Sequence, residues 1–130
     1  MNIIGEVISS ALGADSAVVA LVGTRVSPNV RPQAEVFPCV VYSVISDIPE
    51  NSLAGSSETR LSHARVQVDV YAKGYKEAQQ AWLEIDRVLG NLNNIDSNGN
   101  GAVGWRENAR DLYDNEAQLH RVSADYIFSR

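Results

Sequence analysis

The sequence predicts an α+β fold, with a mostly antiparallel sheet of four to five strands and helices packed on one face. Residues 64–71 alternate apolar and polar side chains, which is the period of a strand with one buried face. Residues 75–89 repeat apolar side chains at helical spacing, and Gly90 follows them. Residues 39–45 form a β-branched run, which predicts a strand with most of both faces covered. Because an amphipathic helix needs a sheet to cover its apolar stripe, these elements form two layers.

The length and composition indicate a single globular domain over residues 1–130. Apolar residues make up 45% of the chain and charged residues 21%, as in ordinary folded proteins. Cys39 is the single cysteine, so an internal disulfide is excluded. The N-terminal residues lack the basic start of a signal peptide, and no apolar run is long enough to span a membrane. We therefore expect a protein that is made in the cytoplasm and has no membrane partner.

The charge argues against nucleic-acid binding as the main activity. The net charge is −5, and the eleven Lys and Arg residues are scattered along the chain. Affinity for nucleic acid comes mostly from clustered basic side chains that contact phosphates.

The N-terminal segments predict two short helices. Residues 2–12 carry apolar pairs at helical spacing, and Gly13 can end that helix. Asp15 or Ser16 can cap a second helix, which Gly23 ends. Three prolines make residues 24–38 irregular, except for a short edge strand at 24–26.

The remaining segments predict two loops and two C-terminal strands. Residues 47–60 are polar and longer than a hairpin needs, which indicates a functional loop that becomes ordered on assembly. Residues 91–104 are rich in Asn and Gly and predict a second loop. Weaker strands are expected at 103–107 and 119–128.

Catalytic constellations are absent from the sequence pattern. His63 and His120 lie in predicted strands, and neither stands near a nucleophile elbow. Cys39 lies in an apolar run, where cysteine behaves as a small apolar residue. A pairing of Asp111 with Asp114 or Glu116 falls in an expected turn, where Asp is common for backbone reasons. The sequence therefore predicts that the protein is not an enzyme and needs no cofactor.

One segment matches the pattern of an EF-hand calcium loop. Asp96, Asn98, Asn100 and Glu107 stand at positions 1, 3, 5 and 12, with Gly101 at position 6. However, the loop offers only two formal negative charges, the preceding helix ends at Gly90, and no second copy exists. An ordinary turn is favoured, and a small binding module that holds calcium through residues 96–107 remains the alternative function.

In their order and spacing, the segments resemble the phage and prophage tail-completion proteins, also called tail terminator or tail-to-head joining proteins. Residues 17–26 precede a Pro-containing linker, and residues 37–42 read Phe-Pro-Cys-Val-Val-Tyr. The strand at 64–72 reads Ala-Arg-Val-Gln-Val-Asp-Val-Tyr-Ala, and a helix follows it. The chain closes with Asp-Leu-Tyr-Asp at 111–114 and His-Arg-Val-Ser-Ala-Asp-Tyr at 120–126.

The resemblance implies a structural subunit of the virion, placed at the head-proximal end of the tail and made in the cytoplasm of a bacterial host. Such proteins form a ring of six copies that caps the tail tube and offers a surface to the head-completion or connector protein. The partners would be further copies of the chain, the tail tube protein and the connector. DNA would pass through the ring without specific binding. The resemblance implies no catalytic residue and no cofactor.

The polar side of the strand at 64–71 is the candidate assembly surface. Its four side chains alternate with the buried valines and contain no catalytic group. We expect this side to meet a neighbouring subunit or the ring lumen. The residues are Arg65, Gln67, Asp69 and Tyr71.

Overall fold

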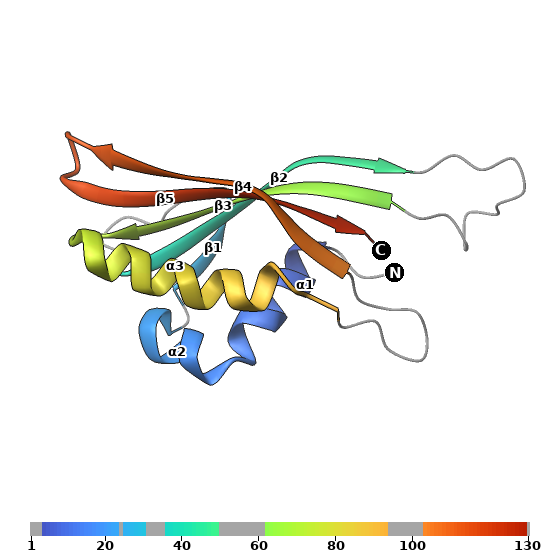
Figure 1. Cartoon of the computed structure of the whole chain (residues 1–130), viewed down its shortest axis with the longest axis horizontal. Coiled ribbons are helices and arrows are strands. Elements are labelled where there is room, and N and C mark those ends of the chain that lie inside the picture. The colour runs from blue at the N-terminus through green and yellow to red at the C-terminus, as the bar shows by residue number, and fades with distance from the viewer. Residues whose placement is uncertain (1–3, 24, 31–35, 50–61, 94–102, 130) are drawn as a thin grey trace, which may run out of the picture.

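A computed structural model describes residues 4–23, 25–30, 36–49, 62–93 and 103–129. Its core is a five-stranded sheet in the order β1-β2-β3-β5-β4, and three helices cover one face of it (Figure 1). Only the β1–β2 pair is parallel, and the other three pairs are antiparallel. The predicted α+β fold and the two-layer arrangement are confirmed.

The two N-terminal helices form as expected. Helix α1 spans Ile4–Gly13 and buries one side against the core, and α2 spans Ser16–Val22. Asp15 caps α2, because its Oδ1 accepts hydrogen bonds from the backbone N–H groups of Ala17 and Val18. No single helix in the described residues is long and apolar enough to cross a membrane. The pair α1 and α2 passes that test only when joined across a bend of 91°, and residues of both helices lie in the core.

The first half of the sheet contains the edge strand β1, Val26–Pro28, and the long strand β2, Cys39–Pro49. The short edge strand predicted at 24–26 lies about two residues further along the chain. Strand β2 continues four residues beyond the predicted end at Ile45, so the expected loop does not begin at Asp47. The rest of that loop prediction, residues 50–60, lies outside the described residues.

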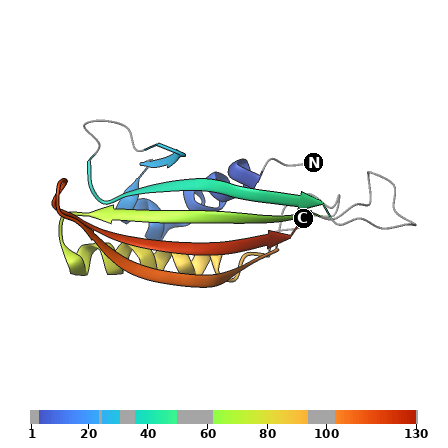
Figure 2. The ribbon, with the colours of Figure 1, turned by 90° about the horizontal axis from the view of Figure 1, so that it is seen from above.

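The second half of the sheet follows the amphipathic pattern closely. Strand β3 spans Ser62–Ala72, α3 spans Tyr75–Leu89, and β5 spans Leu119–Ser129. Seen from above, these strands lie side by side over the long helix (Figure 2). The apolar residues on the helix face of β3 and β5 are buried, from Val66, Val68 and Val70 to Tyr126 and Phe128.

Strand β4 is longer than the sequence pattern indicated. It spans Val103–Asp114, whereas a strand was expected only over residues 103–107. Asp111 and Asp114 therefore lie in a strand rather than in a turn, and only Glu116 lies in the turn to β5. The prediction failed because β4 is exposed on both faces along most of its length and so shows no apolar alternation.

Asp15 links the stability of α2 to pH. Arg87 donates hydrogen bonds to both Asp15 carboxylate oxygens, at 2.7 and 2.9 Å. These bonds, with the bonds from the capped backbone, hold the pKa of Asp15 below its ordinary value of 3.8. A carboxyl whose pKa falls on folding stabilises the native state above its unfolded pKa, and protonation removes that contribution as the pH falls through the folded pKa.

We expect Asp15→Ala to lower the free energy of unfolding at pH 7, with a difference from the parent protein that becomes smaller as the pH falls through the folded-state pKa of Asp15. Urea titrations across this range, followed by circular dichroism, would measure both values. Glu84→Ala is the matched control, because it removes the other carboxylate that pairs with Arg87 but leaves the helix cap in place. A constant difference across the pH range would contradict the assignment.

Candidate assembly surface

The four residues predicted for assembly lie together on the face of the sheet that the helices leave uncovered, called the outer face here. Arg65, Gln67, Asp69 and Tyr71 alternate along β3 with the alanines and valines that are buried against the helices. Strand pairing places three of them beside polar residues of β5, since Gln67, Asp69 and Tyr71 pair with Asp125, Ser123 and Arg121. Arg65 pairs with Ile127. The structure therefore brings the predicted residues onto one surface.

The centre of the outer face is not the fully hydrated surface that the alternation predicted. Asp69 is only 6% exposed, and Ser123, its partner across the strands, is fully buried. The Arg121 guanidinium contacts the Asp69 carboxylate at 3.2 Å and lies over the ring of Tyr71, with Cζ 5.6 Å from the ring centroid. Gln67 Nε2 donates to Asp69 from the other side at 3.0 Å. Long neighbouring side chains thus cover Asp69, which is the reason that alternation misjudged its exposure.

Two further ion pairs extend across the outer face. Arg65 pairs with Glu107 of β4, and Arg110 of β4 lies 3.6 Å from Asp125. Each of these side chains except that of Asp125 is more than a third exposed, so each pair contributes little to folding stability. The sequence reasoning missed Arg110, Arg121 and Asp125 as members of this surface. Their position follows from the β5 alternation together with the pairing order of the strands, which no local pattern reveals.

Two buried polar atoms of the outer face lack a hydrogen-bond partner among the described residues. They are Nε of Arg121 and Oγ of Ser123. A buried polar group that is left without any partner costs about 1–3 kcal/mol.

The calcium alternative gains no support from the described part of the loop. Glu107, the expected bidentate ligand, lies in β4 and pairs with Arg65. Asp96, Asn98 and Asn100 lie outside the described residues, so the site stays a prediction. Among the described residues, no group of three or more His, Cys, Asp or Glu side chains could hold a metal ion.

The candidate catalytic residues do not come together in the described chain. His63 pairs with Ser129 at one end of the sheet, and His120 pairs with Ala72 at the other end. His120 lies among aromatic side chains, with its ring centroid 4.8 Å from that of Tyr113. Cys39 is buried at the start of β2.

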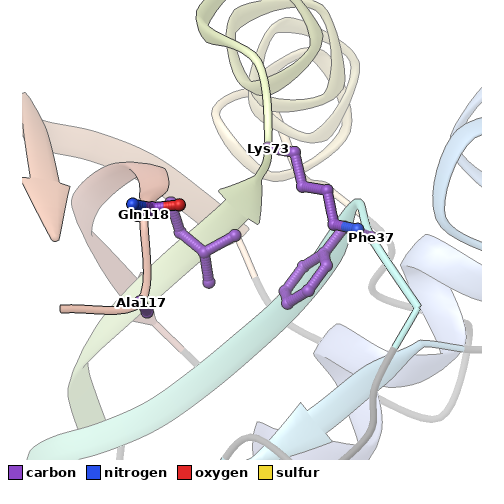
Figure 3. A pocket seen from close by; sticks show the side chains of 5 residues that line it. Phe37, Lys73, Ala117 and Gln118 are labelled. Atoms are coloured by element: carbon purple, nitrogen blue, oxygen red, sulfur yellow. The ribbon is translucent and has the colours of Figure 1, made fainter. Parts of the chain in front are cut away.

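A hollow of about 510 Å³ opens at the end of the sheet where β2 begins and the β4–β5 turn lies. Figure 3 shows the Phe37 ring and the side chain of Lys73 on one side of it, with Ala117 and Gln118 across from them. Leu119 completes the lining. Lys73 is the one charged residue among the described lining residues.

Comparison with known proteins identifies the family. The family model described as tail completion protein gp17 matches residues 6–128, which is nearly the whole chain. A chain from a solved structure titled "Virion of native gene transfer agent (GTA) particle" has a similar fold, with a TM-score of 0.67 at 17% sequence identity. That similarity covers 94% of this chain and 90% of the other. No curated protein matches the sequence. The chain therefore belongs to the tail completion protein gp17 family and has a structural role in the phage tail.

Proposed function

We propose that the chain forms a ring of six copies that caps the finished tail tube, stops its growth and joins it to the head connector. The observation that supports this most is the family match over residues 6–128 on a two-layer fold. A closed ring requires head-to-tail contacts between two different surfaces of each copy. In this proposal the subunit is made in the bacterial cytoplasm, takes its place at the head-proximal end of the virion, and catalyses no reaction.

Deletion of the gene from the phage or prophage that encodes the protein tests this function. Without a cap, tube growth loses its stop and the connector loses its docking surface. Electron micrographs of lysates should then show separate heads and tails, with tails of irregular length, and supply of the protein in trans should restore joined particles. Joined particles with tails of normal length in the deletion strain would contradict the proposal.

The outer face is proposed as part of the assembly surface, through Arg65, Gln67, Asp69 and Tyr71. Three arginines and three carboxylates form ion pairs across it, so their charges balance. A balanced polar face suits a subunit contact, and it also suits a lumen wall that DNA passes without binding. The overall charge of −5 is therefore carried elsewhere on the chain.

We expect Arg65→Glu to weaken ring assembly by about tenfold, because the new carboxylate repels Glu107 and reverses the local charge of the contact. Assembly on tail tubes, followed by sedimentation and electron microscopy, would measure the loss. Lys76→Glu is the matched control, since it makes the same charge reversal at an exposed position on α3. If both variants and the parent protein assembled equally well, the outer face would not be part of the subunit contact.

A further inference from the structure

The sheet has two long edges along which, among the described residues, no strand lies for most of the length. On β4, the outer edge is paired only near its start, where Asn93 forms a bridge with Val103 and the N–H of Gly104 donates to the Leu92 carbonyl. On β2, the edge strand β1 pairs only with residues 40–42. Within the described chain, residues 105–114 of β4 and 43–49 of β2 therefore have a neighbouring strand on one side only. Figure 2 shows these two strands along opposite sides of the sheet. Such edges pair readily with another strand.

The charged side chains of β4 do not block its edge, because interactions hold them over the two faces of the sheet. On the helix face, Arg106 pairs with Asp86, and Asp111 accepts a hydrogen bond from Gln79 at 2.8 Å. On the outer face, Glu107 pairs with Arg65 and Arg110 with Asp125. Charges along an edge usually keep other strands away. In β4 these charged side chains interact with residues on the two faces of the sheet, so they leave the backbone at the edge accessible.

Apolar side chains are exposed mainly on these same two strands. Eleven large apolar side chains are exposed among the described residues, and six of them lie on β2 or β4. Helix α3, although longer, contributes only Tyr75 and Leu83. A strand added at either edge would cover part of this apolar area. The six are Val44, Ile45, Ile48, Trp105, Leu112 and Tyr113.

The strand directions fit pairing between two copies related by rotation. From β2 to β4 the direction reverses at each of three antiparallel pairs, so the two edge strands run antiparallel to each other. A rotation about an axis along the strands leaves strand direction unchanged. The β2 edge of one copy therefore meets the β4 edge of the next as an antiparallel pair, and all helices stay on the same side. A contact of this kind is head-to-tail and can close into a ring.

We infer that a second copy of this chain occupies each free edge, so that the β2 edge at residues 43–49 pairs with the β4 edge of its neighbour. The inference rests on the proposed ring and names the contact that closes it. Glu107, the partner of Arg65, lies on the β4 edge, so Arg65→Glu also changes the electrostatic interactions at this contact. Each of the two edge strands has one register shift against its inner neighbour, at Val44/Ser46 and at Arg106/Asn108.

Cysteine cross-linking tests the edge contact directly. Ser46 and the β4 residues Asn108, Arg110 and Leu112 all lie on the outer-face side of their strands. Ser46→Cys would be combined with a cysteine at each β4 position in turn, in a Cys39→Ala background. Side chains opposite each other in a ladder have Cβ atoms about 4.5–5.5 Å apart, so a single register allows only one or two of these pairs to react.

After mild oxidation of assembled protein, we expect one or two of the three combinations to give a ladder of covalent oligomers on non-reducing gels. Ser46→Cys with Leu83→Cys is the control, because Leu83 is exposed on α3, away from both edges. That pair should stay monomeric on the gel. Rings in the electron microscope without cross-links in any edge pair would overturn the inference and leave the proposed function standing. No ring, even with tail tubes present, would overturn both.

A second measurement does not depend on the register. Ile48 on β2 and Leu83 on α3 have similar exposure, 63% and 58%, so replacing either by Lys removes a similar exposed apolar side chain. We expect Ile48→Lys to raise the subunit concentration needed for half-assembly by about tenfold, since apolar contact at the edge is lost. Leu83→Lys should leave it unchanged. Equal values for the two variants would overturn the edge contact.

Discussion

Asp69→Arg should lower the free energy of unfolding by about 3–5 kcal/mol, the usual cost of breaking a buried ion pair by removing one partner. The substitution places a second guanidinium beside Arg121, which now contacts the Asp69 carboxylate at 3.2 Å. It also removes the acceptor of the Gln67 amide. With Asp69 only 6% exposed, little water can screen the two positive charges. Urea denaturation followed by circular dichroism would measure the loss.

Asp125→Arg provides the comparison for this prediction. Asp125 lies on the same face and pairs with Arg110 at 3.6 Å. Both of these side chains, at 19% and 44%, are more exposed than those of Asp69 and Arg121, at 9% and 30%. We expect this reversal to cost about 1 kcal/mol or less, because exposed pairs contribute little. Similar losses in the two variants would show that burial does not set the cost. The same difference makes Arg65→Glu a better probe of assembly than Asp69→Arg, since the latter also damages the fold.

Gly104→Val should destabilise the protein by about 3 kcal/mol, the upper end of the usual cost of overpacking a core. A Cβ at this position would lie 2.4 and 2.5 Å from two carbons of the Phe128 ring and 3.1 Å from the Leu89 carbonyl oxygen. The ring of Phe128 is fully buried, so it has no free space to enter. Thermal and urea unfolding would both report the change.

Gly13 offers a matched control for the glycine prediction. A Cβ added there meets no other atom within 4 Å, and Gly13 ends α1 without a positive φ. Gly13→Val should therefore change stability much less than Gly104→Val, apart from the small difference in helix propensity. If Gly104→Val cost less than about 1 kcal/mol, the close packing of β4 against Phe128 would be contradicted.

Local periodicity was a sufficient guide to the amphipathic elements. Helix α3 was predicted with its observed bounds, 75–89, and β3 and β5 were placed to within two residues at each end. These elements bury one side only, so their sequences carry a clear period. The same reasoning failed for the second half of β2 and for residues 108–114 of β4. Most side chains of these segments are exposed, so their sequences show no clear period. Backbone pairing, rather than side-chain burial, makes those segments strands.

The sequence by itself determined the α+β class, the two layers, the amphipathic elements and the resemblance to tail-completion proteins. The tertiary structure alone decided which polar residues share the outer face, because this depends on the pairing of β3 with β5 and of β5 with β4. It also decided that Asp69 is buried beneath Arg121, although its position in the alternation indicated a hydrated side chain. The two free edges likewise follow only from the strand order. Strand pairing depends on backbone hydrogen bonds between residues that are distant in the sequence. Local periodicity predicts that a segment is a strand, but it does not predict which other strand it pairs with.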